Sequence, residues 1–107
     1  MKARSGTGED AMKTYSGTRT IDGLRVTVDG APLGEHLEVG QFSDAGFEWG
    51  YVGDAPKQLA LALLCESLGD PQAALAQADG FMQDVVSILD NDWDLTDADI
   101  QAALKKG

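Results

Sequence analysis

The chain has 107 residues, a formal net charge of −10 and one cysteine. This length fits a single domain, and one cysteine excludes a disulfide within the chain. No apolar run approaches the roughly 18 residues of a membrane span, and residues 1–10 lack the apolar core of a secretory signal. We therefore expect one cytoplasmic domain that makes no contact with a membrane.

The N-terminal half carries strand patterns. Residues 1–13 are small and polar without periodicity, so we expect a flexible leader and then a single domain over residues 14–107. Residues 24–28 alternate apolar and polar side chains between two Asp-Gly turns, which predicts a strand in tight hairpins. Residues 15–19 predict a weaker partner strand, and residues 31–33, with their proline, predict a short irregular edge.

A loop and an aromatic segment follow. Residues 34–44 are typical of a loop, with a short extended piece at residues 37–39. In residues 47–51 the aromatic residues Phe, Trp and Tyr occupy alternate positions, which predicts the last strand with these rings on one face. Glu48 then lies on the opposite face, where we expect it to be solvated or paired with an arginine.

The rest of the chain has helical patterns. We expect Asp54 to cap a helix that runs to about Leu68 and stops at Gly69. Apolar residues cover most of the circumference of this helix, which predicts that it is central and buried on several sides. Asp70, followed by proline, is expected to cap a second helix whose apolar stripe continues to Leu89.

Gly80 lies inside the second helix, where glycine costs roughly 1 kcal/mol relative to alanine. A close helix crossing would explain it. Residues 90–95 predict a connector, and Thr96 with Asp99 resembles a capping box before a short last helix. Strands followed by helices predict an α+β fold, in which a small N-terminal antiparallel sheet of three to four strands packs on about three C-terminal helices.

Six motifs follow one another along the chain in a fixed order and spacing. They are Tyr15-Ser16-Gly17-Thr18-Arg19, Val26-Thr27-Val28-Asp29-Gly30, Gly46-Phe47-Glu48-Trp49-Gly50-Tyr51, Gly53-Asp54-Ala55-Pro56, Gln58-Leu59-Ala60-Leu61-Ala62-Leu63-Leu64 and Trp93-Asp94-Leu95-Thr96. Together they resemble a family of small uncharacterised proteins found in bacteria, archaea and phages. The resemblance covers about residues 15–100 and implies a shared fold, but no activity. The chain departs from that family at Asp54-Ala55-Pro56, where the family often has Ser-Gly-Pro.

The negative charge is concentrated in the C-terminal half. Residues 58–104 contain no lysine or arginine but hold Glu66 and eight aspartates. Such a surface attracts basic partners and repels nucleic acid and anionic membranes. The alternative is that these aspartates serve solubility, helix capping and turns.

No group of residues forms a specific catalytic or cofactor signature. The turn before the first helix lacks the spacing of a phosphate-binding loop, and Asp54 and Pro56 oppose an anion there. Asp90, Asp92 and Asp94 have the spacing of an EF-hand loop, but its glycine and its final glutamate are missing.

His36 is the only histidine in the chain, so no second histidine could share a metal ion with it, and we expect a surface loop residue. Cys65 falls in the buried helix, where we expect an inert thiol.

We therefore expect a non-enzymatic, acidic protein-binding module with no cofactor and no metal. Its hypothesised role is that of a phage or mobile-element inhibitor, similar to anti-CRISPR proteins, that masks the nucleic-acid-binding surface of a basic protein without binding nucleic acid itself. The alternative is a structural module that forms a homodimer through the edge of its aromatic strand.

Trp49 and Trp93 are expected in or near the core, and Trp93 is also a candidate partner anchor. The expected partner-binding residues are Asp84, Asp90, Asp92, Trp93, Asp94, Asp97 and Asp99.

Overall fold

The computed structural model of the protein describes residues 12–106. The leader predicted over residues 1–13 lies outside these residues except for Met12 and Lys13. Strands precede and follow a helical middle section. In chain order the elements are β1 (Thr14–Thr20), β2 (Gly23–Val28), β3 (Ala31–Pro32), α2 (Asp54–Leu68), α3 (Pro71–Asp84), the short 3₁₀ helix η2 (Val86–Ile88), β4 (Trp93–Thr96) and α4 (Asp97–Lys106).

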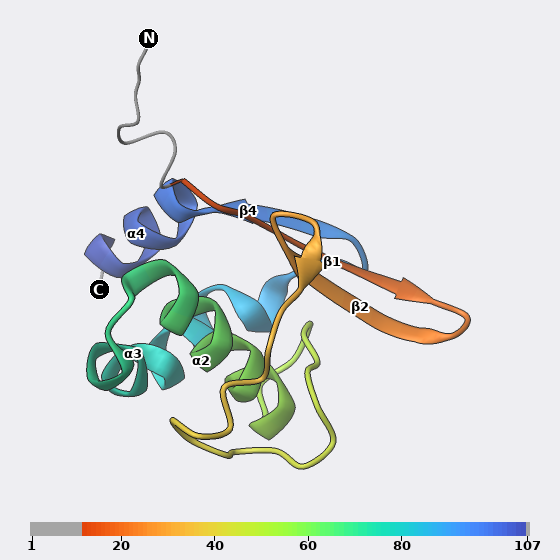
Figure 1. Ribbon diagram of the computed structural model, residues 1–107, viewed down its shortest axis with the longest axis horizontal. Coiled ribbons are helices and arrows are strands. Elements are labelled where there is room, and N and C mark those ends of the chain that lie inside the picture. Colours follow the sequence, from red (N-terminus) through yellow and green to blue (C-terminus); the bar gives the residue numbers. More distant parts are fainter. Residues whose placement is uncertain (1–11, 107) are drawn as a thin grey trace, which may run out of the picture.

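The strands form one antiparallel sheet in the order β3-β2-β1-β4. Figure 1 shows this sheet along one side of the helices, with the β1–β2 hairpin extending beyond them. Two-residue turns join the first three strands. Asp29 and Gly30, between β2 and β3, both have positive φ angles of 51° and 86°, as the primed hairpin turns require. The α+β prediction is confirmed.

Helix α2 is the centre of the core. Its six consecutive residues 59–64 are fully buried, because the sheet covers one side of the helix and α3 and α4 cover others. The helix ends where it was expected to end, at Gly69, which has a left-handed φ of 67°. Its start differs from the prediction: Gly53 occupies the capping position, and Asp54 is the first helical residue and caps no N–H group. Asp70 caps α3 as predicted, accepting from the N–H groups of Gln72 and Ala73.

The aromatic segment 47–51 is not a strand, so this prediction is wrong. Gly46 and Gly50 have φ angles of 87° and 88°, which break the extended backbone at both ends. The N–H of Gly50 donates to the carbonyl of Val86 at 3.0 Å rather than to a neighbouring strand. Without a strand here, the homodimer edge expected at this segment does not exist.

The fourth strand comes instead from residues predicted to be a connector. Trp93–Thr96 pairs antiparallel with β1, and Gly17 lies opposite Trp93. Both tryptophans belong to the core, as expected: Trp49 and Trp93 meet edge to face with 5.6 Å between ring centroids. The Trp93 ring lies so close to Gly17 that a side chain at position 17 would overlap it.

Three smaller predictions are also wrong. Residues 37–39 form a turn rather than an extended piece, since the N–H groups of Val39 and Gly40 both donate to the carbonyl of His36. Helix α3 ends at Asp84, so the predicted stripe does not continue as one helix, and Ile88 is 75% exposed. A side chain added at Gly80 would meet nothing within 4 Å among the described residues, so no helix crosses closely there.

Gly17 and Gly80 give a matched test of the packing, because one faces an indole ring and the other faces open space. We expect Gly17→Ala to destabilise the protein by about 3 kcal/mol, because the new methyl group overlaps an indole ring that Trp49 already holds in place. Gly80→Ala adds the same methyl group to an open helix position and is expected to stabilise by about 0.5–1 kcal/mol. Urea unfolding measures both, and equal effects would contradict the close approach at Gly17.

Candidate functional site: the acidic edge of the sheet

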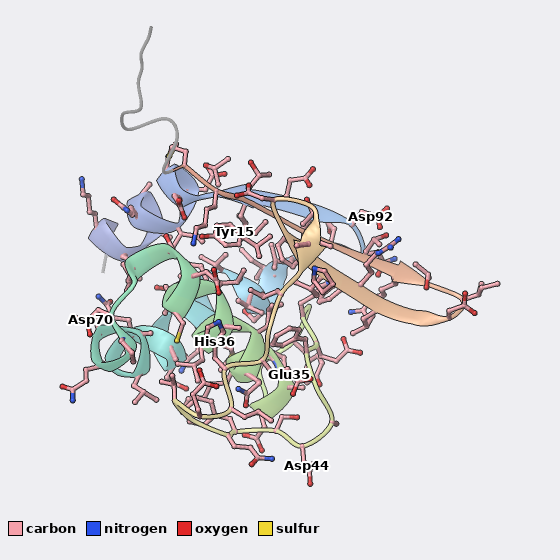
Figure 2. All side chains as sticks on the ribbon, viewed as in Figure 1. Tyr15, Glu35, His36, Asp44, Asp70 and Asp92 are labelled. Atoms are coloured by element: carbon pink, nitrogen blue, oxygen red, sulfur yellow. The ribbon has the colours of Figure 1, made fainter. Side chains whose placement is uncertain are left out.

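Two aspartates project from the open face of the sheet at its β4 edge. Along β1 and β4 the side chains alternate, so that Trp93 and Leu95 face the helices while Asp94 faces outward. Asp92, which precedes β4, also lies on the side of the sheet away from the helices (Figure 2). In an extended chain, residues two apart are separated by about 6.6 Å, so the two carboxylates lie on neighbouring positions of one surface.

Hydroxyl groups of β1 orient both carboxylates. The Ser16 hydroxyl donates to Asp94 at 2.6 Å, and the Thr18 hydroxyl donates to Asp92. Each hydroxyl uses one carboxylate oxygen, which leaves the other oxygen open to solvent. A shallow depression lies here, and Arg25 on β2 borders its far side. Sequence reasoning did not single out Ser16 and Thr18, although strand alternation places both on the outward face of β1.

The expected partner-binding residues divide into two groups. Those that are exposed have no lysine or arginine within 4 Å among the described side chains. The exposed group consists of Asp84, Asp90, Asp92, Asp94 and Asp99. We call Asp90, Asp92, Asp94 and Asp99 the acidic edge; Asp84 lies apart, at the end of α3.

The remaining two predicted residues point inward. Trp93 and Asp97 are each only 7% exposed, so neither is available to a partner in this structure. The Asp97 carboxylate accepts from the Tyr15 hydroxyl at 2.6 Å and from the Lys13 N–H at 2.8 Å. Burial, together with this carboxylate, raises the pKa of Tyr15 far above its ordinary value. Asp97 therefore joins the start of α4 to the start of β1, where Tyr15 lies (Figure 2).

Lys13 belongs to the folded domain rather than to a leader. Besides its backbone bonds to Asp97, its ammonium group lies 3.2 Å from Glu66 on α2. The Nε2 of His36 lies 3.0 Å from the other carboxylate oxygen of Glu66, so His36 is half-buried in a polar cluster, whereas a surface position was expected. Partial burial by itself raises the pKa of Glu66, but the hydrogen bonds from Lys13 and His36 outweigh it and the net shift is downward.

Glu48 and Cys65 are the other candidate residues. Glu48 forms an ion pair with Arg19 at 2.9 Å, which confirms the expectation that it pairs with an arginine. The same guanidinium lies over the Trp49 ring. Cys65 is half-buried; burial, followed by the charges of Glu38 and Glu66, raises the pKa of its thiol and so disfavours the reactive thiolate. Within residues 12–106, no three side chains of the metal-binding types are grouped to hold an ion.

We expect Glu66 to make folding stability fall in acid. Its folded pKa is lower than the ordinary value of about 4.3, so the unfolded chain takes up the proton first as the pH falls. The stability that Glu66 contributes is therefore complete above that value and is lost as the pH falls through the folded pKa. The difference in unfolding free energy between wild type and Glu66→Gln should shrink from pH 6 towards about pH 3. In a Lys13→Met background the difference should be smaller at pH 6, and an unchanged difference would contradict the assigned contact.

Asp97 is expected to act through stability. Asp97→Ala leaves the buried Tyr15 hydroxyl and the Lys13 N–H without their acceptor, which should cost about 3 kcal/mol. Asp94→Ala is the matched control, since it removes an exposed carboxylate with one hydroxyl partner and should cost less than about 1 kcal/mol. Chemical unfolding compares the two, and a loss for Asp97→Ala no larger than that for Asp94→Ala would contradict the structural role assigned to Asp97.

Residues 15–106, from the first residues of β1 through α4, match the model of a family of unknown function (DUF6166). No curated protein and no solved structure matches the chain. Within residues 12–106, no helix is long and apolar enough to cross a membrane. The family match includes both halves of the sheet, β1 and β4, together with the helices between them, and the chain therefore belongs to this family of unknown function.

Proposed function

We propose that this protein is a non-enzymatic binding module whose acidic edge engages a basic protein surface. Asp92 and Asp94 carry the proposal, because they stand side by side on an open sheet face and hydroxyl groups hold both in place. Carboxylates that are already oriented lose less side-chain freedom when a partner binds. Asp90 and Asp99 extend the same charge on either side of β4.

The proposed partner is a protein that normally binds nucleic acid. Lysine and arginine side chains that contact phosphates form rows of positive charge, and a row of carboxylates can occupy them in place of the phosphates. The formal net charge of −10 speeds the approach to such a partner and opposes direct binding of nucleic acid. An origin in a phage or mobile element, as an inhibitor similar to anti-CRISPR proteins, belongs to this proposal.

The same charge weighs against self-association at this edge. Two copies that paired through β4 would bring the Asp92 and Asp94 carboxylates of both chains together, and like charges placed opposite each other on paired strands destabilise them. A partner strand or groove with positive charge meets no such repulsion.

The test uses two double variants that change the net charge equally. Asp92→Asn/Asp94→Asn keeps an oxygen for each β1 hydroxyl but removes both charges, and Asp22→Asn/Asp44→Asn removes two exposed charges elsewhere. With each protein as bait in a bacterial lysate, mass spectrometry compares the captured nucleic-acid-binding proteins. We expect the first variant to capture them at least tenfold less than wild type, and the second to match wild type.

Two further measurements decide the mechanism. Capture by the wild-type protein should weaken as salt is raised, and added nucleic acid should displace it from the captured partner. Equal capture by both variants, or capture that neither salt nor nucleic acid reduces, would overturn the proposal.

A further inference from the structure

The opposite edge of the sheet is left partly open. Strand β3 has only two residues, and its pairing with β2 covers Thr27 and Val28. Beyond them one further bond, from the Leu33 N–H to the Val26 carbonyl at 3.0 Å, completes the contact. The chain then leaves the sheet, so the first half of β2 has a neighbour on one side only.

The register shows which backbone groups of β2 are unpaired. Thr20 and Gly23 close a two-residue hairpin, so every second residue from Gly23 directs its N–H and C=O groups towards β1. Asp29 lies six positions after Gly23 and fits this alternation, because its N–H donates to the Thr14 carbonyl on the β1 side at 2.8 Å. Leu24 and Val26 therefore direct theirs away from β1. In the described part of the chain, no backbone partner meets the N–H and C=O of Leu24 or the N–H of Val26.

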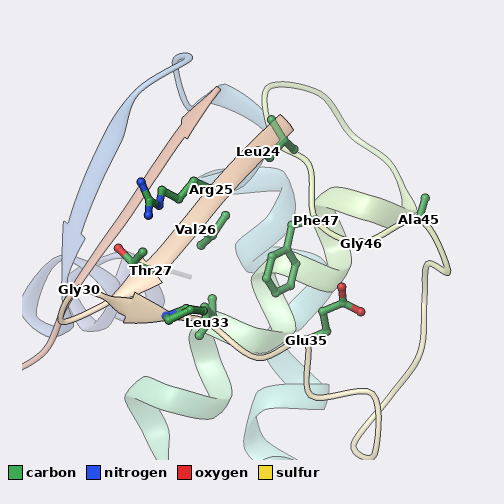
Figure 3. Close-up of a pocket in the computed structure, with 11 residues that line it drawn as sticks. Leu24, Arg25, Val26, Thr27, Gly30, Leu33, Glu35, Ala45, Gly46 and Phe47 are labelled. Atoms are coloured by element: carbon green, nitrogen blue, oxygen red, sulfur yellow. The ribbon is translucent and has the colours of Figure 1, made fainter. Parts of the chain in front are cut away.

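A groove of about 480 Å³ lies beside this open edge. Leu24 and Val26 form one wall, Leu33 lies at its base, and Phe47 faces β2 from the loop on the other side (Figure 3). Two charged side chains border the groove. Arg25 points towards the open face of the sheet, and Glu35 lies below Phe47, where it has no lysine or arginine within 4 Å among the described residues.

The loop that holds the far wall is tied to the core by one buried side chain. The Gln58 amide oxygen accepts from the N–H groups of Phe42 and Ser43, at 2.7 and 3.2 Å. Its amide nitrogen donates to the carbonyls of Glu35 and Gly40, at 2.8 and 3.0 Å. Four bonds from a fully buried residue hold the loop in place, so the groove exists before any ligand arrives.

We propose that this groove binds an extended segment of another protein, which adds as a strand to the open edge of β2. The unpaired groups at Leu24 and Val26 require a ligand with free backbone donors and acceptors, and a helix has already used its own. An apolar side chain of the segment would lie against Phe47 and Leu33, and a neighbouring lysine or arginine would meet Glu35. A second copy of the chain is disfavoured because each copy carries a formal charge of −10.

The test begins with a phage-displayed library of random decapeptides selected on the immobilised full-length protein. A synthetic, fluorescein-labelled copy of the most enriched peptide is then titrated by fluorescence polarisation. We expect enriched peptides to alternate apolar residues with others and to carry a lysine or arginine. N-methylation at every second peptide residue should weaken binding about tenfold where the N–H faces β2, and little at the residues between.

Variants of the protein test the edge itself. Leu24→Pro removes an N–H that faces away from β1 and leaves the ladder to β1 intact, so binding should fall at least tenfold. Glu35→Lys should weaken the same peptide, whereas Asp22→Lys, an equal charge change at the hairpin tip, should not. The N-methyl scan uses the wild-type protein and stays decisive if Leu24→Pro fails to fold.

Three results would overturn the proposal: no enriched peptide, a uniform response to N-methylation, or a wild-type dimer by light scattering that Glu35→Lys abolishes. The last result would assign the edge to a second copy. Peptide binding should not respond to Asp92→Asn/Asp94→Asn, because those residues lie across the sheet at β4. Loss of one surface can therefore be distinguished from loss of the other.

Discussion

The close approach of Trp93 to Gly17 is the contact on which the rest of the structure depends. Only a residue without a side chain lets the indole ring pass beneath β1, and the ring then meets Trp49 edge to face. This contact places Trp93 on the inner side of the sheet. Because side chains alternate along a strand, it also places Asp94 on the outer side. The outward position of Asp94 in the acidic edge therefore follows from how the tryptophan is buried.

The two edges of the sheet are protected by different means. At β4, carboxylates discourage another copy of the chain from adding a strand, which is a common way to prevent aggregation at an exposed edge. At β2, the hairpin return of β3 covers the last residues, and the loop that follows covers the remainder only in part. A single small sheet therefore offers a charged surface at one side and a backbone surface at the other.

The local patterns of the sequence predicted most elements, and long-range contacts explain the errors. The hairpins, the buried α2, the Asp70 cap and the Thr96–Asp99 capping box depend on neighbours in the chain, and all are present. The alternation in residues 47–51 also has a strand pattern, but two glycines with positive φ end it on both sides. The strand at Trp93–Thr96 is only four residues long, so its partner β1, far away in the chain, decides its conformation. For the candidate site, counting aspartates found the exposed charges but could not show that Asp97 turns inward to Tyr15.

The pairing of β1 with β4 also has a consequence for how the chain folds as it is made. The two strands are separated by most of the sequence, so the first strand leaves the ribosome long before its second neighbour exists. We expect the β1–β2 hairpin and the α2–α3 pair to form early, because their partners are close in the chain. The Tyr15 hydroxyl can find its acceptor, the Asp97 carboxylate, only after residue 97 has been made. Because contacts of such long sequence separation slow folding, we expect the domain to close last where β1 meets β4, beside the acidic edge.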